Sequence, residues 1–220
     1  MVVCIVVCMI VGYLFGCIQT GYIVGRVNKI DIRDYGSGNS GTTNTLRTLG
    51  KTAAIITFLG DAAKGLVAVN LARYVIMPAF GVEGEAYLWL LTGFAVVLGH
   101  NFPFYLKFKG GKGIACTSGM ILAVCPLAAP VCLILFIGSI AITRYVSLGS
   151  ILVVTSYLVQ VLIFGHMGYL HIDAAYLPEF YVVSACFTAM ALWRHRSNIG
   201  RLLHGTENKF TFKKNKQEGK

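Results

Sequence analysis

Long apolar runs separated by short polar connections dominate this chain of 220 residues. An α-helix rises about 1.5 Å per residue, so about 20 apolar residues cross the ~30 Å hydrocarbon core of a bilayer. The pattern therefore predicts an all-α integral membrane protein. Its apolar runs cover roughly residues 2–25, 53–80, 87–106, 114–143, 147–170 and 176–193.

The run at 114–143 is too long for one crossing, because a single helix of that length would measure about 45 Å. Pro126 and Pro130 interrupt it. Both of its ends, Lys112 and Arg144, are basic, and basic connections stay on the cytoplasmic side of a membrane. We therefore expect two short helices that meet near Pro126–Pro130, which gives about seven transmembrane helices.

The positive charges predict the orientation of these helices. Of the 19 Lys and Arg residues, 17 lie in the segments 26–51, 107–112 and 194–220 or at Arg144. The connections near 81–86 and 171–179 carry only acidic charges. The positive-inside rule then places the N-terminus outside and the C-terminus in the cytoplasm. No charged residue precedes Arg26, which argues against a cleaved signal peptide.

The composition excludes an ordinary soluble globule, since 56% of the residues are hydrophobic, 13% are charged and the mean hydropathy is +0.69. No hydrophilic stretch is long enough to form a second domain. We expect one transmembrane domain over residues 1–209 and a basic cytoplasmic tail over 210–220, which would lie against anionic lipid headgroups rather than bind nucleic acid. The seven cysteines lie in apolar runs without metal-ligand spacing, so no metal or cofactor is indicated.

A glycine-rich polar loop follows the first apolar run and leads to Arg47. Three of its first six residues are glycine, which lets backbone N–H groups turn inward as a nest, while Ser, Thr and Asn add short donors. A loop that needed only flexibility would not need so many donors beside a guanidinium, so we favour phosphate binding. The expected binding residues are Ser37, Gly38, Asn39, Ser40, Gly41, Thr42, Thr43, Asn44 and Arg47.

A second cluster of glycine and lysine, residues 107–113, begins the fourth apolar run. It places Gly110, Gly111 and Lys112 at the start of a helix, where backbone N–H groups and the helix dipole favour an anion. It is not a nucleotide P-loop, because Gly113 stands where that motif has Ser or Thr. Charges that only mark the cytoplasmic side would explain the lysines but not the glycines.

A third cluster follows the last apolar run. His195, Asn198 and Arg201 are spaced by three residues, so on a helix they form a polar stripe that would hold hydroxyl and phosphate groups. His195 would be a general base near neutral pH, or an interfacial histidine in a basic segment. Glu207 follows within the same segment.

Two polar features lie inside the apolar runs themselves. Asp61 and Lys64 are three residues apart, and charged groups at membrane depth need partners, so we interpret them chiefly as an internal ion pair. Ser150 is expected to face the site. His100 is interpreted as a packing group.

Together these motifs resemble one family. In order they are Gly36–Arg47, Asp61-x-x-Lys64-Gly65, His100-x-x-Pro103 continuing into Lys109–Gly113, and His195-x-x-Asn198 continuing to Lys209. The chain is similar over nearly its whole length to the bacterial acyl-phosphate:glycerol-3-phosphate acyltransferase family, PlsY. Ser40 departs from the family pattern, which usually has an apolar residue or proline there.

The resemblance implies a seven-helix enzyme of the bacterial plasma membrane whose active site faces the cytoplasm. It would transfer a fatty acyl group from acyl phosphate to the 1-hydroxyl of sn-glycerol 3-phosphate, giving lysophosphatidic acid and phosphate, the first step of phospholipid synthesis. Its partners would be these two substrates and membrane lipids, with no cofactor, metal or nucleic acid. The resemblance implies catalytic roles for His195, Asn198, Lys112 and Ser150, and substrate binding by the residues of the two glycine-rich loops, Arg201 and Glu207.

Two questions stay open at this stage. Either His195 or the phosphate of the bound substrate accepts the hydroxyl proton. The competing class of function is an anion or organophosphate carrier. The concentration of polar groups at one side argues against a carrier, which needs access from both sides.

Overall fold

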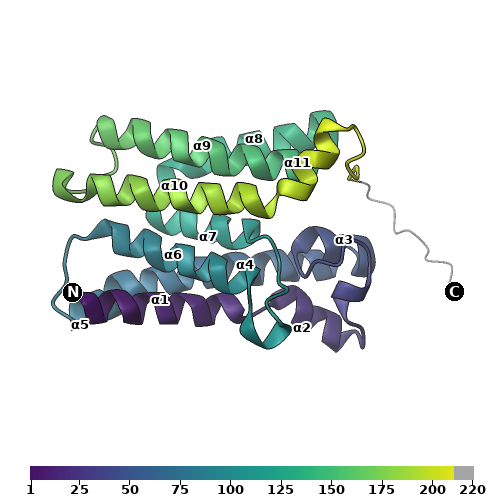
Figure 1. Cartoon of the computed structure of the whole chain (residues 1–220), viewed down its shortest axis with the longest axis horizontal. Helices are drawn as coiled ribbons and strands as arrows, with labels where there is room; N and C mark the ends of the chain where they lie inside the picture. Colours follow the sequence, from purple (N-terminus) through teal and green to yellow (C-terminus); the bar gives the residue numbers. More distant parts are fainter. Residues whose placement is uncertain (211–220) are drawn as a thin grey trace, which may run out of the picture.

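The computed structural model describes residues 1–210, and within that range every regular element is helical. The long helices lie side by side in one bundle, with α8, α9 and α10 along one side and α1, α4 and α6 along the other (Figure 1). The all-helical membrane class expected from the sequence is confirmed, whereas residues 211–220 of the expected tail lie outside the described range. The α-helices are α1 (Val2–Cys17), α2 (Thr20–Val27), α3 (Thr42–Leu49), α4 (Lys51–Leu71), α5 (Met77–Ala79), α6 (Ala86–Asn101), α7 (Ile114–Val124), α8 (Ala129–Thr143), α9 (Val146–His166), α10 (Leu177–Arg194) and α11 (Arg196–Leu203).

The expected break in the fourth apolar run is present. Helix α7 ends at Val124, a short 3₁₀ turn covers Pro126–Ala128, and α8 begins at Ala129 with Pro130 in its first turn. Proline suits this position because the first turn of a helix does not need its N–H group. The run is therefore divided into two helices that meet at Pro126–Pro130, as the prolines predicted.

Six segments are long and apolar enough to cross a membrane, and Ile114–Val124 is a shorter apolar helix beside them. At about 1.5 Å per residue, its 11 residues measure about 16 Å, less than the hydrocarbon thickness. The count of seven crossings thus stays a prediction. So does the orientation, although the N-terminus and α11 lie at opposite ends of the bundle, as an odd number of crossings requires (Figure 1).

Small residues let the helices approach closely. A Cβ atom on Gly12 or Gly99 would meet backbone of the facing helix in the α1–α6 contact, and one on Gly65 or Gly119 would do so between α4 and α7. Membrane helices usually pack in this way. The hydrophobic effect does not drive helices together inside lipid, so close van der Waals contact between them contributes more to their association.

The two ends of the bundle differ in chemistry. The acidic connections meet at one end, where the Tyr176 hydroxyl donates to the Glu85 carboxylate over 3.4 Å. Helices α3 and α11 lie at the other end (Figure 1), where the backbone N–H of Phe210 also donates to the Arg144 carbonyl at the end of α8. All three predicted polar clusters therefore reach the same end of the bundle.

Candidate active site

A cavity of about 220 Å³ opens at the polar end of the bundle. It brings together residues from both glycine-rich loops and from the segment after α10. Of the predicted site residues, the lining includes Ser37, Asn39, Gly41, Thr42, Thr43, Asn44, Arg47, Lys112, Ser150, His195, Asn198, Arg201 and Glu207.

The first loop is held in shape by Asn44, which is almost fully buried. Its amide oxygen accepts from the Ser37 N–H at 2.8 Å, and its amide nitrogen donates to the carbonyls of Ile32 and Tyr35. The loop ends in α3, whose first residue, Thr42, has a buried hydroxyl without a partner among the described residues. A helix N-terminus with a free hydroxyl, and with Arg47 of the same helix lining the same cavity, is suited to an anion.

Two of the predicted binding residues of the first loop do not line the cavity. Ser40 is buried and its hydroxyl donates to the Gln19 amide oxygen at 2.9 Å. Gly38 is exposed and has φ +68°, a backbone conformation that favours glycine. Both positions shape the loop without lining the cavity.

The second loop contributes Lys112 to the cavity, whereas Gly110 and Gly111 lie beneath it. The N–H of Gly111 donates to the His100 carbonyl at 3.1 Å, and the Gly111 carbonyl accepts from Arg194 at 2.7 Å. A Cβ atom on Gly111 would meet the imidazole ring of His100. The glycine thus permits the close approach that places Lys112 over the cavity.

A polar network joins Lys112 to the C-terminal segment. Its ammonium donates to the Asn198 amide oxygen, and the Asn198 amide nitrogen donates to both carboxylate oxygens of Glu207 at 3.2 Å. The Arg201 guanidinium donates to the same carboxylate at 3.0 Å. Glu207 therefore organises these cations, and the site keeps an excess of positive charge because Arg47 lines the same cavity.

Burial lowers the pKa values of two cations that line the cavity. Burial lowers the pKa of Lys112 to about 8, and the nearby Arg201 adds to the effect while Glu207 opposes it. Burial also lowers the pKa of Arg47, which stays charged because a guanidinium titrates far above neutral pH. The Lys112 ammonium is thus a titratable charge near the physiological range.

His195 lies between α10 and α11 and is almost fully buried. Its Nδ1 lies 2.8 Å from the Ala191 carbonyl, which can only accept, so Nδ1 carries the proton and Nε2 is an acceptor. Burial lowers the pKa of His195 to about 4. The imidazole is therefore neutral at pH 7, and it is a weak base.

The cavity also has an apolar wall and two serines of α9. The Ser150 hydroxyl donates to the Val146 carbonyl at 2.9 Å, while that of Ser147 is buried without a partner among the described residues. The apolar lining comes from four helices and consists of Phe58, Ile114, Ala115, Phe136 and Val146.

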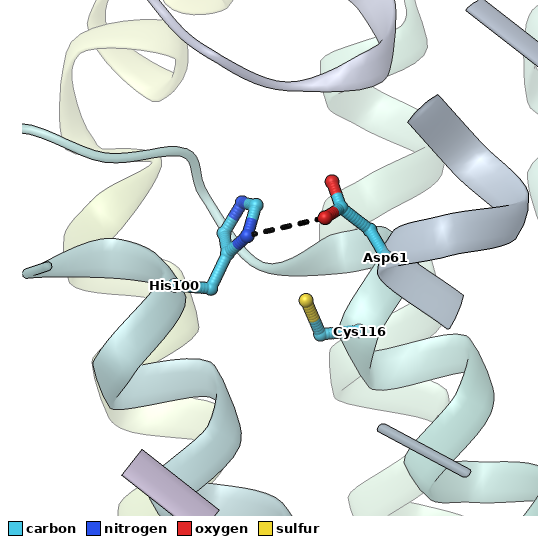
Figure 2. A group of neighbouring side chains, drawn as sticks. All are labelled: Asp61, His100 and Cys116. Carbon is cyan, nitrogen blue, oxygen red and sulfur yellow. Dashed lines mark ion pairs between the residues drawn. The ribbon is translucent and has the colours of Figure 1, made fainter. Parts of the chain in front are cut away.

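The predicted ion pair of Asp61 and Lys64 is present, with 2.9 Å between Oδ1 and Nζ. Asp61 and His100 also line the cavity. Figure 2 shows Asp61, His100 and Cys116 facing one another, and their ligand atoms lie close enough to surround a metal ion. The Lys64 ammonium, however, lies 2.9 Å from both Asp61 Oδ1 and His100 Nδ1. These residues therefore fit an ammonium better than a metal, which would compete for the same atoms.

Several lining residues were not singled out from the sequence as part of the site. Phe58 and Phe136 look like ordinary lipid-facing positions in their apolar runs, and Ser147 resembles a helix cap. A second cavity of about 230 Å³ shares Ser37, Asn39, Lys112, Arg201 and Asn208 with the first and adds Ser197. In the sequence, Ser197 and Asn208 are marked only by lying next to predicted site residues, Asn198 and Glu207.

Comparisons with known proteins agree with this geometry. The family model described as glycerol-3-phosphate acyltransferase matches residues 6–205. A glycerol-3-phosphate acyltransferase of Halalkalibacterium halodurans is 42% identical over 210 residues, covering 94% of this chain and 96% of the relative. A glycerol-3-phosphate acyltransferase of Clostridioides difficile is 41% identical over 215 residues, covering 95% of this chain and 97% of the relative.

Two solved structures are also similar. Both are crystal structures of PlsY, an integral membrane glycerol 3-phosphate acyltransferase, one in a glycerol 3-phosphate form and one in a lysophosphatidic acid form. Their TM-scores are 0.80 and 0.78, each at 33% identity and covering 94% of this chain and 96% of the solved chain. These findings fit the enzyme interpretation and not the carrier.

Proposed function

The chain belongs to the glycerol-3-phosphate acyltransferase family, and from this premise we propose which donor it uses and which residues act. The donor is acyl phosphate, and the acceptor is the 1-hydroxyl of sn-glycerol 3-phosphate. The products are lysophosphatidic acid and inorganic phosphate. The enzyme is a multi-pass membrane protein, and we place it in the bacterial plasma membrane with this cavity facing the cytoplasm.

One observation carries the proposal: a single cavity joins two separate cationic loops to an apolar wall. A reaction between two phosphate compounds, one with a fatty chain, needs that combination. The α3 N-terminus with Arg47 suits one phosphate, and Lys112 with Arg201 suits the other. The acyl chain would lie along Phe58 and Phe136 toward the bilayer.

The chemistry needs little from the protein beyond charge and position. The substrate hydroxyl oxygen attacks the acyl carbonyl carbon, the new C–O ester bond forms, and the bond between the carbonyl carbon and the phosphate oxygen breaks. The phosphate leaves with the electron pair. Cations held around the leaving phosphate stabilise the charge that develops on it. Binding both substrates in one cavity raises the rate further, because it brings the hydroxyl and the acyl carbonyl together in a fixed orientation.

The proton route follows from the state of His195. A base with a pKa of about 4 accepts a proton poorly at pH 7. A phosphate monoester has a second pKa of about 6, so the phosphate of the bound substrate is the better base. We therefore assign the proton of the attacking hydroxyl to a substrate phosphate, which accepts its hydrogen bond. His195 Nε2 then accepts a hydrogen bond from the 2-hydroxyl of glycerol 3-phosphate and so orients the attacking hydroxyl.

The test is transfer of a radiolabelled acyl group from synthetic acyl phosphate to glycerol 3-phosphate by the purified protein in detergent. Acyl-CoA is the parallel donor. We expect lysophosphatidic acid from acyl phosphate only, and a large loss of product in Lys112→Ala. Product from acyl-CoA alone would contradict the donor assignment. No product from either donor, in protein shown to be folded, would contradict the proposed reaction.

A further inference from the structure

A buried polar connection links the two phosphate loops from behind the cavity. It centres on Gln19, which is fully buried at the break between α1 and α2. The Gln19 amide oxygen accepts from the Ser40 hydroxyl at 2.9 Å, on the first loop. Its amide nitrogen donates to the His100 carbonyl at 3.0 Å, and the same carbonyl accepts from the N–H of Gly111, on the second loop.

The break itself explains why polar side chains gather here. A helix interrupted inside a membrane leaves carbonyls without partners, and each must be satisfied within the protein. The Gly16 carbonyl accepts from Gln19 at 3.3 Å and from Lys64 at 3.1 Å, and that of Ile18 accepts from Lys64 at 2.5 Å. The Tyr105 hydroxyl donates to the third carbonyl, that of Cys17, at 2.8 Å.

The ion pair holds this arrangement from the side of α4. Lys64 Nζ contacts Asp61 of its own helix α4 and the imidazole of His100 on α6, each at 2.9 Å. With its bonds to the carbonyls at the break, Lys64 therefore connects α4, α6 and the α1–α2 break. The Thr20 hydroxyl, in the first turn of α2, donates to Asp61 at 3.0 Å. The start of α2 is thereby fixed to α4 and α6 at one point.

We propose that Gln19 is a positioning residue for acyl transfer, because its side chain fixes the first phosphate loop and the second at a set separation. We call the path Ser40–Gln19–His100–Gly111 the loop relay. The first bond of this path needs the Ser40 hydroxyl, which donates to Gln19. An apolar residue at this position could not form that bond. The inference rests on the proposed function for its catalytic consequence, but the relay itself is defined by the hydrogen bonds alone.

The relay predicts a specific kinetic pattern. In Gln19→Ala each loop keeps its own cations, so each substrate still binds, but the distance between the acyl carbonyl and the hydroxyl is no longer fixed. A misplacement of about 1 Å costs about 100-fold in rate. We expect kcat to fall about 10- to 100-fold, whereas the KM values for acyl phosphate and glycerol 3-phosphate should change much less. The kcat value is calculated per molecule of enzyme that binds glycerol 3-phosphate, so that unfolded protein is not counted.

Further variants at Ser40, and a control at Thr92, separate the relay from a general loss of structure. Ser40→Ala should slow transfer, Ser40→Thr should restore it, and Gln19→Ala/Ser40→Ala should be no slower than Gln19→Ala alone, because both cut one path. The matched control is Thr92→Val, which removes a buried hydroxyl bonded at 2.8 Å to the Leu88 carbonyl of its own helix. It should leave kcat unchanged.

Hydrogen–deuterium exchange tests the relay without any activity. Gln19→Ala should speed amide exchange in both loops, residues 36–44 and 108–113, whereas Thr92→Val should not. Exchange that rises in one loop alone, or fully additive effects of Gln19→Ala and Ser40→Ala on kcat, would overturn the relay. Absence of acyl transfer in the unchanged protein would instead overturn the proposed function, and the exchange result would still decide the relay.

Discussion

The replacement Glu207→Gln tests the electrostatics of the cavity through its pH dependence. Glu207 is the carboxylate that faces Lys112, Asn198 and Arg201, and its charge raises the pKa of Lys112 against the effect of burial. The Lys112 ammonium is charged below its pKa of about 8 and loses its charge as the pH rises above that value. Since only the charged form attracts phosphate, kcat/KM should fall on the alkaline side of about pH 8.

The size of the effect follows from the bonds that the replacement removes. A hydrogen bond to a charged group contributes roughly 1.5–3 kcal/mol. Glu207 accepts through two oxygens, whereas Gln has one acceptor oxygen and no charge, so only part of these bonds is lost. The Arg201 side chain is 38% exposed, so solvent screens part of its ion pair, and the lower figure applies. A loss of about 1.5 kcal/mol corresponds to about tenfold in kcat/KM at pH 7. The alkaline fall should also begin at a lower pH, because the Glu207 charge that raises the pKa of Lys112 is gone.

The assay is kcat/KM for glycerol 3-phosphate between pH 6.5 and about 9.5, a window that spans the Lys112 titration. This ratio reports the free enzyme, whereas kcat should fall only at higher pH, because bound phosphate stabilises the ammonium. Lys112→Arg serves as the matched variant, since its guanidinium stays charged and the alkaline fall should disappear. An alkaline fall that is the same in Glu207→Gln as in the unchanged enzyme would refute this reasoning.

Three other changes give separate tests. His195→Ala should lower kcat less than about 100-fold, because the imidazole orients the hydroxyl rather than taking its proton, and a loss of 10³-fold or more in rate assays would assign it the role of base. Lys64→Met should lower the free energy of unfolding by about 3–5 kcal/mol by leaving Asp61 unpaired; denaturation in detergent measures this, and a stability equal to that of the unchanged protein would argue against the buried pair. Gly111→Ala should abolish most activity because its methyl group would meet the imidazole beside it, whereas Gly138→Ala, with open space around its Cβ, should retain it; equal activity of the two would contradict the close approach.

The sequence predicted the parts of the site that rest on local chemistry. Glycine-rich loops beside cations, and polar residues at helical spacing, suggest anion binding before any tertiary contact is known. Arg47, Lys112 and Asn198 do line one cavity, and the Asp61–Lys64 pair is present. Their common placement followed from charge, since basic segments of a membrane protein share one side.

The sequence did not predict how the loops are held. Ser40 and Gly111 were grouped with the binding residues, but their contacts lie behind the cavity, because long-range packing decides which face of a loop a residue takes. The break at Ile18–Gln19 was hidden inside a continuous apolar run. Gln19, a single amide within that run, was the one local sign of it.

We propose that acyl transfer in this cavity replaces the phosphate on the acyl carbonyl carbon by glycerol 3-phosphate. The most direct measurement follows labelled inorganic phosphate and lysophosphatidic acid in one reaction of the purified protein with acyl [³²P]phosphate and glycerol 3-phosphate. We expect one phosphate released per lysophosphatidic acid formed, and loss of both products together in Lys112→Ala. Phosphate release without lysophosphatidic acid, at the same rate whether or not glycerol 3-phosphate is present, would contradict it.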